Sequence, residues 1–306
     1  MHVVEKAKDG LVSEELAADS KDVGETKRVS TGSPQLDLLI GGGFPKGRSY
    51  LIAGDSGTGK TIFATAFVLK GLMEGEKAVY VSVDDKPSDI VEQAASLGWD
   101  LTKYISEKQL LMLDASPFFT GSASGKEVDV AKTVVDLASY VTRLGATRVV
   151  IDPVGPLVPS RDSGKRVRDG ARALIRSLRE HLGTTNLLIL PSATSGAAGE
   201  WEDYPVAGVI VLKLSQTPRG LARAILVRKM RATAIELTEY PFRIVNGKGI
   251  VIETSVSGVA PPAPAPAENG QPKVVLALSS EESGKAFEVW EPVVVEEAGK
   301  GKKSAR

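Results

Sequence analysis

Short apolar segments alternate with longer amphipathic segments along the middle of the chain. The short segments have the length of strands and are rich in Val, Leu and Ile, which is typical of strands buried on both faces of a parallel sheet. They are Ser49–Ala53, Ala78–Val83, Leu110–Asp114, Arg148–Asp152 and Asn186–Leu190. The longer segments repeat apolar residues at helical spacing near Lys60–Met73, Pro87–Leu97, Val128–Leu144 and Arg166–His181. This alternation predicts an α/β fold with a mainly parallel sheet flanked by helices.

The pattern changes after residue 205. Four strand-like segments follow one another there, with short turns and no helix between them. They are Ala207–Leu214, Ala222–Arg228, Phe242–Val245 and Gly249–Ile252. Strands joined by short turns pair antiparallel, so these segments predict an antiparallel C-terminal extension on one edge of the sheet.

Composition divides the chain into three parts. Residues 1–28 carry five basic and seven acidic residues and few bulky apolar ones, which predicts a flexible acidic leader. Residues 29–254 hold the regular apolar pattern and are expected to form the folded domain. Residues 255–306 begin with a Pro/Ala-rich linker, and the tail behind the linker has two interpretations. The tail is either disordered, or it carries a short motif, anchored by Trp290, that docks on a partner protein or on the domain itself.

The composition of the whole chain excludes several kinds of site. The chain has 306 residues, of which 42% are hydrophobic, enough for a sizeable core, and it has no cysteine. The absence of cysteine excludes a disulfide scaffold, a Cys-ligated zinc site, an iron–sulfur cluster and a cysteine nucleophile. The 38 basic and 38 acidic residues balance, which argues against a strongly basic nucleic-acid binder but leaves a local basic patch open.

The distribution of apolar residues gives no sign of a membrane segment. No stretch approaches the roughly 18 apolar residues of a membrane-spanning helix. The N-terminal residues are acidic and lack the apolar core of a signal peptide. We therefore expect a cytoplasmic protein with no membrane partner.

The strongest chemical signal is a glycine-rich segment between the first strand and the first long helix. It matches the pattern G-x-x-x-x-G-K-[ST] of a phosphate-binding loop, or P-loop. Its residues are Gly54, Asp55, Ser56, Gly57, Thr58, Gly59, Lys60 and Thr61. The glycines let backbone N–H groups surround phosphate oxygens, and the start of the helix adds its positive dipole end. In such a loop, Lys60 supplies positive charge to the β- and γ-phosphates of ATP, and the Thr61 hydroxyl binds Mg²⁺.

Acidic residues follow two of the predicted strands. A P-loop enzyme needs an acid for Mg²⁺ at the end of a neighbouring strand, and Asp152 ends a β-branched run. Asp84 and Asp85 follow another strand, and the ends of parallel strands face the ligand in open α/β sheets. One of these two acids is a candidate general base for the attacking water. Equally, the pair forms a solvated loop or caps the helix near Pro87.

These motifs, taken in order, resemble the KaiC branch of the RecA-like ATPases. The resemblance is carried by VSTGSPQLD, the Gly-rich turn, the P-loop, YVSVDD, the helix ending in SLGWD, and the later run LVRKMRATAIELTEYPFRIVNGKGIVI. It spans roughly residues 29–252 and implies a single RecA-like P-loop domain. It further implies a homo-oligomer, typically a hexamer, with ATP and Mg²⁺ bound between subunits. In this arrangement Lys229 and Arg231 reach the γ-phosphate bound by the neighbouring subunit.

The chain also departs from the family pattern. The family usually has two glutamates where this chain has Asp84 and Asp85, and a displacement of about 1 Å at a catalytic group can cost about 10²-fold in rate. Pro153 stands where the family usually has a polar residue. Three functions therefore stay open: a KaiC-like ATPase that acts in signalling or regulation through protein partners, a nucleotide-gated scaffold with little hydrolysis, and a RadA-type DNA recombination ATPase.

Overall fold

The structure is a computed structural model that describes residues 26–116, 129–157, 164–191, 205–217, 220–253 and 287–292. Within these residues, ten strands form one sheet in the order β11-β10-β9-β8-β3-β7-β6-β4-β5-β12. The central strands are β3 (Ser49–Gly54), β4 (Ala78–Ser82), β5 (Leu110–Asp114), β6 (Arg148–Asp152) and β7 (Thr185–Pro191). They pair in parallel, as the run of buried apolar segments predicts.

The C-terminal extension has the predicted strands and one difference in direction. It consists of β8 (Gly208–Thr217), β9 (Gly220–Met230), β10 (Glu239–Val245) and β11 (Gly249–Ile252). Strand β8 pairs in parallel with β3, and the antiparallel pairing begins only between β8 and β9. The short connections predicted antiparallel pairing among the four strands. They gave no information on the direction in which β8, the first of the four, pairs with β3.

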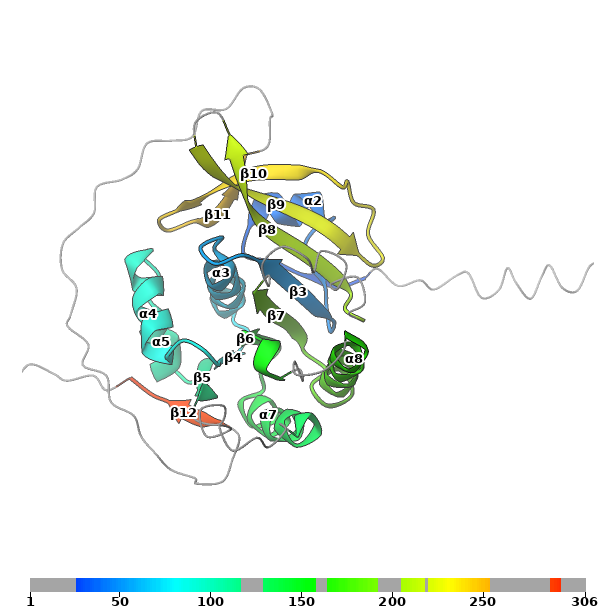
Figure 1. Ribbon diagram of the computed structural model, residues 1–306. Coiled ribbons are helices and arrows are strands. Elements are labelled where there is room, and N and C mark those ends of the chain that lie inside the picture. The colour runs from blue at the N-terminus through cyan, green and yellow to red at the C-terminus, as the bar shows by residue number, and fades with distance from the viewer. Residues whose placement is uncertain are drawn as a thin grey trace, which may run out of the picture.

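Helices cover both faces of the sheet (Figure 1). One face packs against α3 (Lys60–Met73), α4 (Pro87–Ser96) and α5 (Leu101–Ser106), and the other against α7 (Val130–Leu144) and α8 (Gly164–His181). Successive residues of each strand alternate between the two resulting cores, so that Tyr80 lies on the α3 face and Val81 on the α7 face. A turn of 3-10 helix, η2 (Gly155–Leu157), follows β6. The predicted α/β class is confirmed.

Several short elements were not predicted. They include β1 (Arg28–Val29), β2 (Phe44–Pro45), which pairs with β1, α2 (Pro34–Leu39) and the short helix α5. Arg28 ends the segment expected to be a flexible leader, yet its guanidinium donates hydrogen bonds to the carbonyls of Ile40 and Gly43 at 2.9 and 2.8 Å. The rest of the leader, residues 1–25, lies outside the described residues.

One segment of the tail belongs to the sheet. Strand β12 (Glu288–Trp290) pairs antiparallel with β5, at the edge opposite to β11. In the structure these residues dock on the domain itself, which is one of the two arrangements expected for the tail. Residues 254–286 and 293–306 lie outside the described part of the chain.

A buried arginine joins the start of β6 to α3 and to the N-terminal segment. The Arg148 side chain is fully buried, and its guanidinium pairs with both carboxylate oxygens of Glu76, at 3.0 Å each. It also donates to the carbonyls of Ser30 and Phe67, at 2.7 and 2.8 Å. A buried cation is tolerated when it is paired and hydrogen-bonded in this way. The network therefore fixes β6 against α3, the two elements that carry the site described next.

Candidate nucleotide-binding site

The P-loop connects β3 to α3, as predicted. An added Cβ at Gly54 would lie 2.3 Å from the backbone oxygen of Leu212 on β8, so only glycine fits between the two strands. Gly59 precedes α3 with φ of 102°, a conformation that favours glycine. These two positions explain why the loop needs glycine where the motif has it.

Hydrogen bonds inside the loop converge on one carbonyl. The Lys60 ammonium and the Thr58 hydroxyl both donate to the backbone oxygen of Asp55, at 2.8 Å each. Burial lowers the pKa of Lys60, and the nearby carboxylates of Asp152 and Asp55 oppose that shift. The lysine is therefore held over the loop by its hydrogen bond to Asp55, in the lining of a cavity described below.

Asp152 lies at the end of β6 and accepts two hydrogen bonds on the same oxygen. The Thr61 hydroxyl donates to Asp152 Oδ2 at 2.9 Å, and the Tyr80 hydroxyl donates to it at 2.7 Å. Burial raises the pKa of Asp152, while these two hydrogen bonds act in the opposite direction. Tyr80 is fully buried, and its pKa is raised well above the ordinary value by burial and by the adjacent Asp152 charge. Pro153 follows through a cis peptide bond.

Asp84 and Asp85 lie beside Asp152 because β4 and β6 are neighbours. The Val83 N–H donates to the Asp152 carbonyl at 2.9 Å, which brings the chain after β4 against the end of β6. Burial raises the pKa of Asp84, and the charge of Asp85 adds to that rise. A carboxylate whose pKa is raised is a stronger base when it is ionised, which is the property expected of a group that orients an attacking water.

A cavity of about 470 Å³ lies beside β12, and a second cavity, of about 460 Å³, collects most of the predicted site groups. The lining of the second cavity includes the predicted residues Ser56, Gly57, Gly59, Lys60, Thr61, Asp84, Asp85 and Asp152. The lining also includes Gln93, Arg223 and Ile244, which the sequence analysis missed. Arg223 of β9 donates from Nε and Nη2 to the backbone oxygen of Gly57, at 3.2 and 3.1 Å. Its only sequence signal was a charged residue inside a strand-like segment, which is common on exposed strands.

Lys229 and Arg231 lie away from this nucleotide cavity, at the other end of β9. Lys229 pairs with Val209, and the Arg231 N–H donates to Ala207 at 2.7 Å, level with the start of β3. The P-loop follows the opposite end of β3. Lys229 lies four residue steps along β9 from Ile225, the residue level with Gly54 across β8, which is a distance of about 13 Å. Neither cation approaches the nucleotide cavity of its own chain.

The donor set suits Mg²⁺ bound together with a nucleotide. The Thr61 hydroxyl and the Asp152 carboxylate are hard oxygen ligands, and Mg²⁺ is commonly held by one or two such ligands plus substrate phosphates. Across the described ranges, no group of three or more His, Cys, Asp or Glu side chains is placed to hold a metal ion by itself. The pair formed by Thr61 and Asp152 is the part of the cavity that fits a metal bound with phosphates.

The family model described as "ATPase: KaiC" matches residues 29–257. The chain belongs to the KaiC ATPase family. It is 34% identical over 238 residues to a UPF0273 protein of Methanopyrus kandleri, a match that covers 74% of this chain and 92% of that protein. A UPF0273 protein of Thermotoga maritima is 33% identical over 244 residues, 76% of this chain and 98% of that protein.

Two further comparisons of this KaiC-like chain are with a longer relative and with a relative whose crystal structure is known. The circadian clock oscillator protein KaiC of Thermosynechococcus vestitus is 31% identical over 234 residues, but the match covers only 44% of that protein. The crystal structure of a KaiC-like protein from Pyrococcus horikoshii superposes with a TM-score of 0.63 at 32% identity, covering 75% of this chain and all of that one. The predicted family and RecA-like fold are confirmed, while the roles of the individual site residues stay predictions.

Proposed function

We propose that this KaiC-like protein binds ATP with Mg²⁺ in the P-loop cavity and hydrolyses it. The observation that carries the proposal is the direct hydrogen bond between Thr61 and Asp152 beneath the loop. These are the two residue types that hold Mg²⁺ in P-loop ATPases, and Lys60 lines the same cavity. Bound Mg²⁺ would neutralise phosphate charge, and Asp84 or Asp85 would orient the attacking water.

The phosphates of the nucleotide have a proposed place in this cavity. Its phosphates fit the P-loop end, where backbone N–H groups, the start of α3 and Lys60 supply positive charge. Arg223 and Ile244 form the wall contributed by the C-terminal extension, and Arg223 holds this wall against the P-loop through its hydrogen bonds to Gly57. The P-loop and the extension thus make one binding site from two parts of the fold.

We propose further that the site is completed by a second copy of the chain in a homo-oligomer. Lys229 and Arg231 lie at the far end of their own sheet, so they act on ATP only if they face the cavity of a neighbouring subunit. A cation at the γ-phosphate stabilises the charge that spreads during phosphoryl transfer. Assembly controlled by nucleotide would then serve signalling or regulation in the cytoplasm, through protein partners.

The experiment is to measure ATP affinity and steady-state hydrolysis at several protein concentrations, for the wild type and for Lys60→Ala. We expect Lys60→Ala to lose tight ATP binding and all turnover. Turnover per subunit in the wild type should rise with protein concentration, because an isolated chain lacks the second half of its site. Turnover that is independent of concentration across the assembly range would contradict the shared site.

A nucleotide-gated scaffold with slow hydrolysis is the second candidate. It is favoured by Asp84 and Asp85, whose side chains are one methylene shorter than the glutamates of the resembled family. In that case the wild type binds ATP tightly and in a Lys60-dependent way, with little turnover. The double substitution Asp84→Glu with Asp85→Glu would then raise turnover, and unchanged turnover would locate the cause elsewhere.

A further inference from the structure

Strand β12 is held at the edge of β5 by side chains on both faces of the sheet. Phe287 and Val289 pack into the core on the α7 side, and Trp290 packs into the core on the α3 side. Phe287 and Trp290 are only 4% and 3% exposed. The ring of Phe287 meets Tyr140 of α7 edge to face, with centroids 6.3 Å apart. This is the arrangement of a peptide strand added to an open sheet edge, with main-chain pairing and pockets for alternate side chains.

The edge that β12 covers would otherwise be an apolar strand with unpaired backbone groups. Strand β5 reads LLMLD, and Leu110, Met112 and Leu113 are buried. An open edge of this kind is a template for pairing with a strand from another chain. The segment of β5 that pairs with β12 is short: Glu288 pairs with Asp114, and Trp290 pairs with Met112.

The connection to β12 is long enough to serve another copy of the chain. It leaves β11 at one edge of the sheet and must reach the opposite edge beyond β5, nine strand spacings away in all, about 43 Å. The connection has 33 residues, numbered 254–286, which reach about 110 Å when extended. The tether therefore sets no requirement that β12 pair with its own chain.

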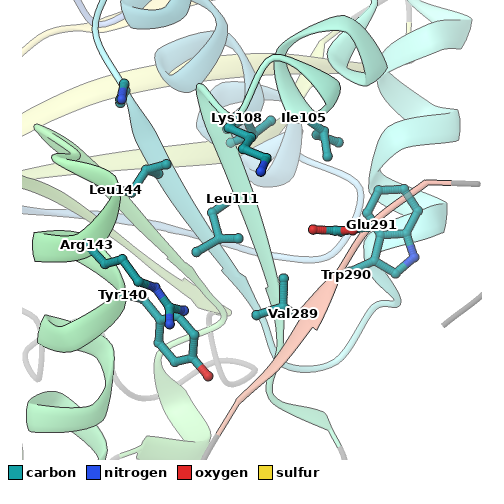
Figure 2. A pocket seen from close by; sticks show the side chains of 11 residues that line it. Ile105, Lys108, Leu111, Tyr140, Arg143, Leu144, Val289, Trp290 and Glu291 are labelled. Atoms are coloured by element: carbon teal, nitrogen blue, oxygen red, sulfur yellow. The ribbon is translucent and has the colours of Figure 1, made fainter. Parts of the chain in front are cut away.

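The cavity beside β12 shows that the strand does not fill its groove (Figure 2). The cavity measures about 470 Å³ and lies among residues of α5, α7, β5 and β12. In Figure 2, Val289 and Trp290 point to opposite sides of β12, and Tyr140 and Arg143 approach from α7. The lining includes the cations Lys77, Lys108 and Arg143 together with Glu291 of the tail. The strand is thus held by short pairing and two aromatic anchors.

We propose that β12 is an exchangeable strand: the edge of β5 accepts β12 of a second copy of this chain as well as its own. The contacts are the same in both cases, because an exchanged element repeats its intramolecular contacts in a neighbour. The choice between the two depends only on the local concentration of each strand. The tail thereby links copies through a site on the sheet edge that is separate from the nucleotide cavity.

The test uses the absence of cysteine from the chain. Leu113 of β5 and Val289 of β12 lie opposite each other in the register, at a separation that a disulfide can bridge. A chain with Leu113→Cys is mixed with a chain carrying Val289→Cys and oxidised under mild conditions. We expect a mixed disulfide-linked dimer, which neither variant forms to the same extent alone. Adding Phe287→Asp and Trp290→Asp to the Val289→Cys chain should abolish the cross-link.

A chain with both Leu113→Cys and Val289→Cys is the matched control. If it closes an internal disulfide while the mixed chains form none, β12 stays with its own chain and the exchange is refuted. If the double variant also fails to cross-link while circular dichroism shows that it is folded, β12 does not pair with β5 and the proposal loses its basis. Cross-linking that survives loss of both aromatic anchors would be non-specific and would equally overturn the proposal. ATP affinity measured in parallel reports separately on the proposed nucleotide site.

Discussion

The hydroxyl of Tyr80 is predicted to set the Mg²⁺ affinity of the nucleotide site, and Tyr80→Phe removes it with little change in shape. Tyr80 Oη donates to Asp152 Oδ2 at 2.7 Å inside the core, where water does not replace it. With the hydroxyl gone, the hydrogen bond from Thr61 is the one that the described residues still provide to the carboxylate. The ionised form of Asp152, which binds the metal, is then less well stabilised and less well oriented.

The size of the effect follows from the hydrogen bond that the substitution removes. A hydrogen bond to a charged group contributes about 1.5–3 kcal/mol. Removing a partner that orients a metal ligand typically costs about 10- to 100-fold in metal affinity. We therefore expect the gain in ATP affinity that Mg²⁺ provides to fall by about 10- to 100-fold, while ATP affinity in EDTA changes little.

The assay is isothermal titration of ATP with Mg²⁺ and with EDTA, for the wild type and Tyr80→Phe. Tyr50→Phe is the matched control, because Tyr50 is equally buried and donates to a backbone carbonyl, that of Pro45, at 2.6 Å. It should lower stability and leave the Mg²⁺ effect intact. An unchanged Mg²⁺ effect in Tyr80→Phe would refute the role given to this hydrogen bond, and an equal decrease in both variants would assign it to general destabilisation.

Three further substitutions test other parts of the structure. Arg231→Ala should lower turnover by roughly 10³-fold with little change in ATP affinity, since a γ-phosphate cation acts in the transition state. Steady-state kinetics measure the turnover and titration measures the ATP affinity. A loss of affinity with unchanged turnover would contradict the prediction. Arg223→Ala should weaken ATP binding by about tenfold, because it removes both hydrogen bonds to Gly57 and one wall of the cavity; equal affinities would exclude Arg223 from the site. Burial would raise the pKa of Glu76, but hydrogen bonds from Arg148 and Thr147 outweigh it and hold that pKa below its usual range. The stability from Glu76 is therefore present above its ordinary pKa and lost as pH falls through the lower, folded value, so Glu76→Gln should cost about 1–3 kcal/mol at pH 7 and flatten the acid limb of the unfolding curve.

The sequence was sufficient for the parts of the site that are local. The P-loop lies between one strand and one helix, so its motif and its neighbours could be read together. Asp152 could be found because an acid directly after a β-branched run marks a strand end. The strand boundaries were predicted within a few residues, since each central strand is largely buried on both faces and has a run of apolar residues.

Residues whose partners depend on strand order could not be predicted. Tyr80 looked like one more apolar strand residue, and its contact with Asp152 exists only because β4 lies next to β6. Arg223 meets Gly57 only because β9 folds back along β8, which itself lies beside β3. The helix α5 and the β1–β2 pair are too short to give a periodic signal. No single segment of the sequence indicates which residues will be its neighbours across the sheet.

The position of β12 also orders events during synthesis. Strand β5 is made early, but the strand that covers its edge comes after β11 and a further 33 residues. At roughly 5–20 residues per second, β12 is made about 2–7 s after β11, the last of the other strands of the sheet. During that interval the nascent domain presents an apolar edge that is open to pairing with a strand of another chain.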